Sequence, residues 1–137
     1  MALVRRLKKT IREQRGQSFA EFAVTAPILL MLIIGGIFIG LIVYNQIVII
    51  TSANQGARLG AALHADENVS PYVATQRARD VASATLSHTA GSCSSIQAMR
   101  SGDSFVVDIR CPFQLPIPFM GTETIVLSHR ASYYIFE

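Results

Sequence analysis

The sequence is poor in charge and in cysteine, and it contains no tryptophan. Only 15% of its 137 residues are charged, whereas about a quarter are charged in an average soluble protein. Residues 22–57 include no Asp, Glu, Lys or Arg, a run of 36 positions. Half of the residues are apolar, which excludes a disordered chain. A buried helix of a soluble domain does not need an uncharged run of this length, so a simple soluble domain is disfavoured.

Positive charge is concentrated at the N-terminus. Six of the twelve basic residues lie in the first sixteen positions: Arg5, Arg6, Lys8, Lys9, Arg12 and Arg15. From Gln17 onward, six arginines stand against eight acidic residues, which leaves a net charge of −2. Nucleic-acid binding needs basic residues spread over a folded face, so we expect none. A basic tip before an apolar segment is the positive-inside signal of a membrane protein.

The apolar segment is long enough to cross a bilayer. Residues 28–44 are apolar or glycine throughout, and residues 22–25 and 47–50 extend the run. A hydrocarbon core of about 30 Å needs roughly 20 such residues in a helix. No polar stripe interrupts the run before Asn45, which argues against a soluble core helix. The run is also too long for a secretory signal, whose apolar region has about 7–15 residues. We predict a membrane span with a kink or local opening at Pro27.

The residues at the entrance to this segment form a motif, Gly16-Gln17-Ser18-Phe19-Ala20-Glu21-Phe22. The order of these features resembles the prepilin processing signal of type IV-like filament proteins. A basic tip comes first, followed by Gly16, four further residues, Glu21-Phe22 and an apolar helix. The Glu-Phe variant is that of the tight-adherence (Flp) pilus. With Pro27 and the segment Ala53-Asn54-Gln55-Gly56-Ala57-Arg58, the chain resembles the TadE-like family of pilus-assembly pseudopilins over roughly residues 15–62.

This resemblance implies cleavage between Gly16 and Gln17 by a prepilin peptidase. Glycine has no Cβ to obstruct the protease at the cut. Glu21 of one subunit could then neutralise the new Gln17 amine of the next subunit, which would give a buried charge a partner. The alternative is that Glu21 is an interfacial carboxylate, favoured near a helix N-terminus by the helix dipole. The implied partners are other pilins, the peptidase, inner-membrane pilus platform proteins and lipid.

Small residues recur at a spacing of four along the expected helix. Gly36 and Gly40 form one Gly-x-x-x-Gly pair, and Gly56 and Gly60 form another. Such pairs let two membrane helices approach closely, although glycine is also common in membrane helices and can serve local flexibility. Beyond Asn45 and Gln46 the apolar pattern predicts an amphipathic extension to about His64.

The remainder of the chain predicts a helix followed by antiparallel strands. Ser70-Pro71 is typical of a helix start, and the helix is expected to end near His88, with its period carried by Val73, Arg77, Ala78, Val81, Ala82, Thr85 and Leu86. Residues 90–92 are expected to end this element. Strands are predicted at 96–99, 104–111 and 124–136, with a turn at 101–103. One face of the last strand should carry Ile125, Leu127, His129, Ala131, Tyr133 and Ile135. The proline-rich residues 112–120 are expected to be a connection and not a central strand.

Cys93 and Cys111 are the two cysteines, and both lie on the side expected to be exported. In an oxidising compartment they are expected to pair, which closes a loop of about 18 residues and contributes roughly 3 kcal/mol. His64, His88 and His129 show no ligand spacing, so we predict no metal site and no cofactor. Asp108 and Arg110 are interpreted as a solvated ion pair. No catalytic motif is recognised, and we predict that the protein is not an enzyme.

The sequence therefore predicts a pilin-like α+β protein with three parts: a basic leader at 1–16, a transmembrane helix with an amphipathic extension at 17–64, and an exported domain at 65–137. Its expected location is the inner membrane, as a single-pass protein with a cytoplasmic N-terminus, or an extracellular filament after assembly. The expected function is that of a minor pilin or pseudopilin in a tight-adherence pilus. The alternative is an unprocessed single-span protein whose outer domain scaffolds a secretion or pilus-assembly complex.

Overall fold

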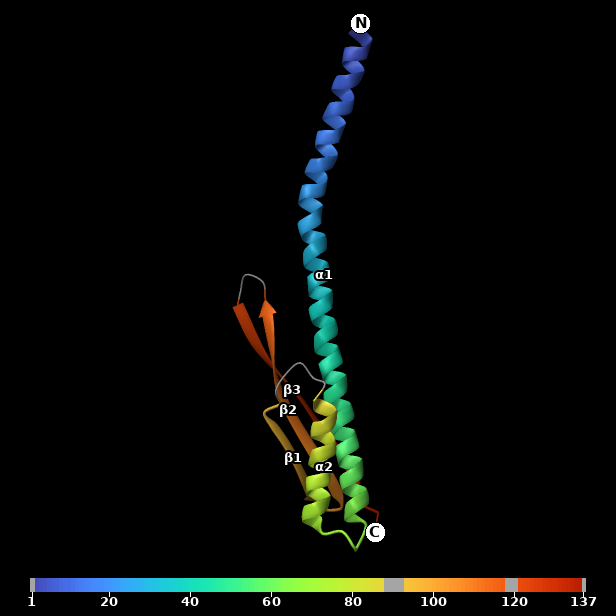
Figure 1. Ribbon diagram of the computed structural model, residues 1–137, viewed down its shortest axis with the longest axis vertical. Coiled ribbons are helices and arrows are strands. Elements are labelled where there is room, and N and C mark those ends of the chain that lie inside the picture. Colours follow the sequence, from blue (N-terminus) through green and yellow to red (C-terminus); the bar gives the residue numbers. More distant parts are fainter. Residues whose placement is uncertain (1, 88–92, 118–120, 137) are drawn as a thin grey trace. The chain divides into compact units, whose positions relative to one another are not determined.

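The computed structural model describes residues 2–87, 93–117 and 121–136, and the side chains of residues 19–87, 93–115 and 121–136. The elements follow in the order α1 (Ala2–His64), α2 (Pro71–Leu86), β1 (Ser95–Ser101), β2 (Ser104–Ile117) and β3 (Gly121–Tyr134), shown in Figure 1. Two helices and a small antiparallel sheet confirm the predicted α+β class. The chain divides into two units, Met1–Gly40 and Leu41–Glu137, and α1 contributes to both.

The first unit consists of the N-terminal part of α1. The helix continues through Pro27, and the large apolar side chains from Phe19 to Ile39 are mostly more than half exposed. By length and composition, residues Phe19–His64 contain a helical segment able to cross a membrane. A helix this apolar and this exposed fits a membrane anchor, because lipid or other helices can cover its side chains.

In the second unit, the remaining part of α1 supplies one wall of the core. Its buried face follows helical spacing and combines Ile49 with the small residues Ala53, Ala57 and Ala61. Two polar side chains are buried beside them. Asn45 donates from Nδ2 to the Leu41 carbonyl at 2.8 Å, and Ser52 donates from Oγ to the Val48 carbonyl at 2.7 Å, so each side chain bonds to its own helix. The helix ends at His64, where the amphipathic pattern predicted its end.

The second helix begins as predicted, and its predicted period is confirmed at Ala78, Ala82 and Leu86. Ser70 is the N-cap and accepts from the Val73 N–H at 3.4 Å, and Pro71 occupies the first turn. The buried stripe is Ala74, Ala78, Ala82 and Leu86, whereas Val73 and Arg77 of the predicted period are exposed. The helix ends at Leu86, two residues before the expected position. Alanines at a spacing of four leave room for a close helix neighbour, which explains why the larger Val73 faces solvent.

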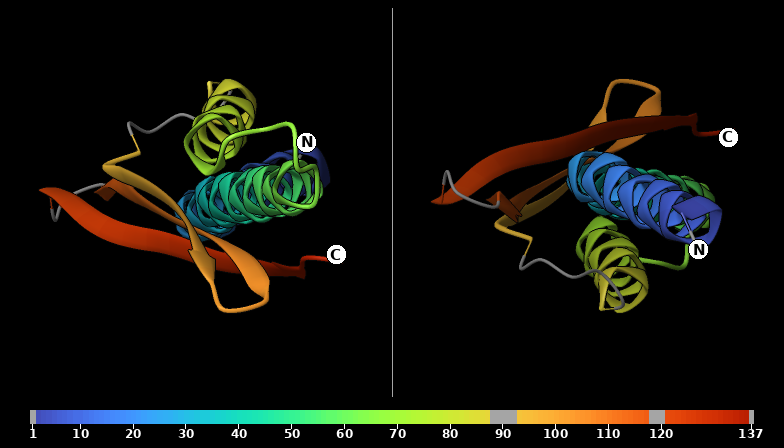
Figure 2. Two further views of the ribbon diagram at one scale, coloured as in Figure 1. Left: turned by 90° about the horizontal axis from the view of Figure 1, so that it is seen from below. Right: turned by 90° about the horizontal axis from the view of Figure 1, so that it is seen from above.

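The three strands form one antiparallel sheet in the order β1-β2-β3. A two-residue loop joins β1 to β2, and Gly102 in it has a φ of 61°, a conformation that glycine adopts without strain. Figure 2 shows α2 and the C-terminal part of α1 on the same face of the sheet. On that face the odd-numbered side chains of β2 are buried: Phe105, Val107, Ile109, Cys111 and Phe113. The predicted inner face of β3 is confirmed at its centre, where Ala131 is buried and Leu127 and His129 are half-buried.

The expectation that the proline-rich residues are a mere connection is wrong. β2, the central strand, runs through Pro112 and Pro116 to Ile117, and these residues pair with β3 from Val126 to Gly121. The Arg110 carbonyl accepts from the Ser94 N–H, so even-numbered residues of β2 direct their backbone groups toward the β1 side. β1 ends its pairing at Ser95 opposite Arg110. Both prolines therefore lie beyond β1 with their nitrogens on an open edge, where no ladder bond is lost. Residues 90–92 and 118–120 of the predictions lie outside the described residues.

Candidate processing and assembly segment

The predicted cleavage site lies within a continuous helical segment. Gly16 and Gln17 belong to α1, and their side-chain surroundings lie outside the described residues. Glu21 follows one turn later with an exposed side chain, and its backbone carbonyl accepts from the Thr25 Oγ1 at 2.8 Å. Phe22 is 68% exposed. The motif thus places an exposed carboxylate and an exposed aromatic ring on the surface of a single chain.

The two Gly-x-x-x-Gly pairs lie in different environments. A Cβ added to Gly36 or Gly40 would have no described atom within 4 Å. No described residue packs closely against this pair, so its packing role stays a prediction. A Cβ added to Gly56 would meet the Ala78 carbonyl oxygen at 3.0 Å and the Ala82 Cβ at 3.2 Å. The missing side chain of Gly56 thus lets α2 of the same chain approach α1.

The segment Gly56-Ala57-Arg58 divides its residues between the core and the surface. Gly56 and Ala57 are buried, with Ala57 fully enclosed, and Arg58 is exposed. The small residues at positions 56 and 57 thus have a direct structural cause in the packing of α1 against α2 and the sheet. Arg58 is the first charged residue after Glu21, so the charge-free run ends at this segment.

A comparison with known protein families gives a match that covers both the motif at Gly16 and the segment that ends at Arg58. Residues 16–58 match the family model of the TadE-like protein. The resemblance expected from the motif at Gly16 and the segment ending at Arg58 is confirmed over this stretch, which we call the TadE-like segment. No curated protein and no solved structure gives a match to the chain.

Just beyond the TadE-like segment, Gly60 contacts the most deeply buried ring of the core. A Cβ added to Gly60 would overlap the ring of Phe105 at Cε1, Cδ1 and Cζ. The Phe105 ring is fully buried, and its centroid lies 4.9 Å from that of His64. His64 also forms a hydrogen bond through Nδ1 with the Gly60 carbonyl at 3.0 Å. The second glycine pair therefore serves contacts within the chain, with α2 at Gly56 and with β2 at Gly60.

A groove of about 300 Å³ lies between the end of α1 and the end of β3. Its lining is apolar and aromatic apart from one arginine: Arg58, Ala61, Ala62, Ala65, Tyr133, Tyr134 and Phe136. Tyr134 and Phe136 form an edge-on pair with ring centroids 5.4 Å apart. The polar groups of its described lining are the Arg58 guanidinium and the hydroxyl groups of Tyr133 and Tyr134.

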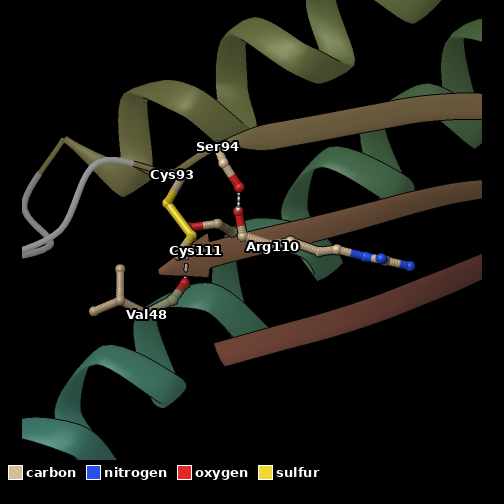
Figure 3. Close-up of a disulfide and its surroundings, with 6 residues drawn as sticks. Val48, Cys93, Ser94, Arg110 and Cys111 are labelled. Carbon is tan, nitrogen blue, oxygen red and sulfur yellow. Dashed lines mark hydrogen bonds between the residues drawn. A yellow bond between two sulfur atoms is a disulfide. The ribbon is translucent and has the colours of Figure 1, made fainter. Parts of the chain in front are cut away.

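The two cysteines form the predicted disulfide. Cys93 precedes β1, Cys111 lies in β2, and the bond links positions separated by 18 residues. Ser94 donates hydrogen bonds to the Arg110 carbonyl from its backbone N–H at 3.0 Å and from Oγ at 3.1 Å. Figure 3 shows these groups together, with Val48 of α1 beside Cys111. The disulfide thus ties the start of the sheet to the strand that contacts α1.

The remaining candidate residues form ordinary surface contacts. No group of three or more His, Cys, Asp or Glu side chains able to hold a metal occurs among the described residues, and His88 lies outside them. Asp108 accepts from Arg110 at 3.4 Å and lies 3.8 Å from Arg130, with both arginines largely exposed. Exposed pairs of this kind contribute about 0–1 kcal/mol.

Sequence reasoning missed Ala74, the first residue of the buried alanine stripe of α2, in whose place it named Val73. It also missed the contact between Gly60 and Phe105. The stripe carried a signal, since Ala74, Ala78 and Ala82 stand at a spacing of four. Alanine is too weakly hydrophobic for that spacing to outweigh valine in a periodicity argument. No local signal pairs Gly60 with Phe105, because the contact joins residues that are distant in the chain.

Proposed function

We propose that the chain is the precursor of a minor pilin or pseudopilin of a tight-adherence pilus, without enzymatic activity. The observation that carries the proposal is the extent of the TadE-like segment. It begins at Gly16, the residue before the proposed cut, and it ends at Arg58, where the charge-free run stops. Between these residues the helix presents apolar side chains that its own chain leaves exposed as far as Ile47.

The proposed maturation separates a basic leader from this surface. Cleavage between Gly16 and Gln17 removes six cations and one acid, Glu13, from the N-terminus. It leaves an α-amino group four residues before Glu21. Stacked subunits without the leader would not repel one another through it, and Glu21 of one subunit can then neutralise the Gln17 amine of the next.

The second unit supports an accessory role. It encloses its own core of α1, α2 and the sheet and is closed by a disulfide, so it is a folded domain carried by the membrane-type helix. Its proposed partners are other pilins through the N-terminal helix and the inner-membrane platform. Its proposed site is the outer side of the inner membrane, with the basic N-terminus in the cytoplasm.

The proposal is tested by Gly16→Val, with Gly16→Ala as the matched control. The branched side chain of valine should block the narrow protease site, so the precursor accumulates in the membrane with its leader intact, whereas the single methyl of alanine should be tolerated better. N-terminal sequencing and a mobility shift on gels measure the outcome. Normal trimming of Gly16→Val would refute the processing assignment. An intact leader on the unmodified protein in cells with an active peptidase would favour the unprocessed scaffold instead.

A further inference from the structure

The feature that goes beyond the proposed function is the distal part of the sheet, residues 112–117 of β2 paired with residues 121–126 of β3. We call it the β2–β3 ribbon. Figure 1 shows the two strands extending past the end of β1. Residues 112–126 contain a single charged residue, Glu123. Val126 is 61% exposed and Ile125 is 39% exposed, so the ribbon presents apolar side chains that its own chain does not cover.

The contacts of β2 with α1 determine which way the ribbon extends. Phe105 lies against Gly60, Val107 lies near Gly56, and Cys111 lies beside Val48. Successive residues of β2 therefore meet earlier and earlier residues of α1, and the two elements run antiparallel. Beyond Cys111, the ribbon continues toward the apolar end of the second unit.

The exposed surface of α1 changes from apolar to polar near Val48, the residue that lies beside Cys111. Leu41, Val43, Tyr44 and Ile47 are between 42% and 56% exposed, whereas the next exposed residues are Thr51, Gln55 and Arg58. In a helix that crosses a bilayer, this change marks the outer limit of the hydrocarbon, and a tyrosine is typical of that boundary. Val48 lies at the boundary and Cys111 lies beside Val48, so the ribbon begins at the membrane surface and continues on its lipid side.

The backbone of the ribbon is suited to partial burial in lipid. Even-numbered residues of β2 direct their backbone groups away from β3, and beyond β1 no strand in the described part of the chain pairs with those groups. Of positions 112, 114 and 116, two are proline and have no N–H. Of these three positions, only Gln114 thus has a backbone N–H on the edge of β2 that faces away from β3. Fewer unpaired donors lower the cost of leaving water, although the remaining edge groups still need the water of the headgroup region.

On the outer face of the sheet the charged side chains lie before the ribbon, whose single charged residue, Glu123, pairs with Leu115 on the opposite face. Arg110 and Arg130 are largely exposed on the outer face and flank Asp108. They are followed toward the ribbon tip by Pro112, Gln114 and Val126 on the same face. Arginines at this position can bind lipid phosphates, while the uncharged residues beyond them enter the apolar boundary.

We propose that the β2–β3 ribbon is a second membrane contact, which inserts beside α1 into the headgroup and upper acyl region of the bilayer. Six residues of strand extend about 20 Å, more than the headgroup layer of about 5–8 Å, so the ribbon is long enough to reach the acyl chains. Two attachments, one spanning and one interfacial, hold the second unit against the membrane before assembly. This inference rests on the proposal that α1 spans a membrane.

The absence of tryptophan from the chain allows a direct test. The full-length protein is reconstituted into phosphatidylcholine–phosphatidylglycerol vesicles whose lipids carry bromine either near the headgroup or near the middle of the acyl chains. Val126→Trp reports on the ribbon. Ser132→Trp is the matched control, because Ser132 is exposed on the same strand and the same face beyond Arg130. Ile33→Trp reports on the spanning helix.

We expect the bromines near the headgroup to quench Val126→Trp, whose emission shifts to the blue, while Ser132→Trp keeps its emission. Equal emission of the two variants, with Ile33→Trp quenched, would overturn the ribbon proposal and leave the span intact. An unquenched Ile33→Trp would instead refute the span. A blue shift of Val126→Trp that grows with the protein-to-lipid ratio without bromine quenching would show that protein covers the ribbon, which also overturns the lipid contact.

Discussion

Adding one methyl group at Gly60 should destabilise the second unit, even though alanine is the better helix former. In an unobstructed helix, replacing glycine by alanine stabilises by about 1 kcal/mol. At Gly60 the new Cβ would overlap the Phe105 ring and would lie 2.6 Å from its Cζ. The ring is fully buried and cannot turn into solvent. Overpacking of this kind costs about 1–3 kcal/mol, and the steric overlap with three ring atoms places Gly60→Ala toward the upper end.

The net expectation for Gly60→Ala is a loss of about 1–2 kcal/mol in the free energy of unfolding. For a domain of this size, that corresponds to a fall in Tm of about 4–16 °C. The assay is thermal unfolding of the full chain in detergent micelles, followed by circular dichroism in the near ultraviolet. Gly36→Ala is the matched control, because its Cβ would meet no described atom and should leave the unfolding of the second unit unchanged.

A double-mutant cycle separates the clash from other effects. Phe105→Leu removes the ring at a cost of about 1 kcal/mol by itself. In its presence the added methyl group has room, so the two substitutions together should cost less than their sum, by about 1 kcal/mol. A Gly60→Ala protein as stable as the unmodified one, or strictly additive costs, would refute the assignment of Gly60 to this contact.

Three further predictions concern the disulfide, the helix cap and the assembly residue. Cys93→Ser should leave membrane insertion unchanged and lower the stability of the second unit by about 2–5 kcal/mol; alkylation of both thiols in the unreduced native protein would contradict the bond. Ser70→Ala should cost about 0.5–1 kcal/mol in thermal unfolding, since it removes the acceptor for the Val73 N–H, and a Tm equal to that of the unmodified protein would dismiss the cap. Glu21→Gln should be trimmed normally but assemble poorly, because breaking a buried pair costs about 3–5 kcal/mol. Pull-down of trimmed subunits measures that effect, and normal assembly would leave Glu21 as an interfacial carboxylate.

The strongest sequence predictions came from features that depend on one stretch of chain. The charge-free run between Glu21 and Arg58 is evident from the residue types alone. The helix start at Ser70-Pro71 depends only on backbone groups within one turn. The motif at Gly16 likewise lies in consecutive residues, which is why the TadE-like segment is recognisable from the amino-acid sequence alone. The disulfide was predictable as well, because two cysteines leave a single intramolecular pairing.

The strand that continues through Pro112 and Pro116 shows where a local rule gives the wrong result. Proline excludes a residue from a strand only if its nitrogen faces a partner strand. Whether it does depends on where β1 ends, and that is set by the register of β1 against β2. The residues next to Pro112 and Pro116 in the sequence do not indicate where β1 ends.

The sequence by itself determined the elements that local chemistry dictates: the apolar helix, its end at His64, the capped second helix and the antiparallel strands. Only the tertiary structure determined which part of the chain each small residue contacts. It assigned Gly56 to the approach of α2 and Gly60 to the ring of Phe105, while Gly36 and Gly40 of the same spacing meet no described atom of the chain. The physical reason is that a glycine leaves the same space wherever it stands, and the neighbour that fills this space comes from residues far away in the sequence.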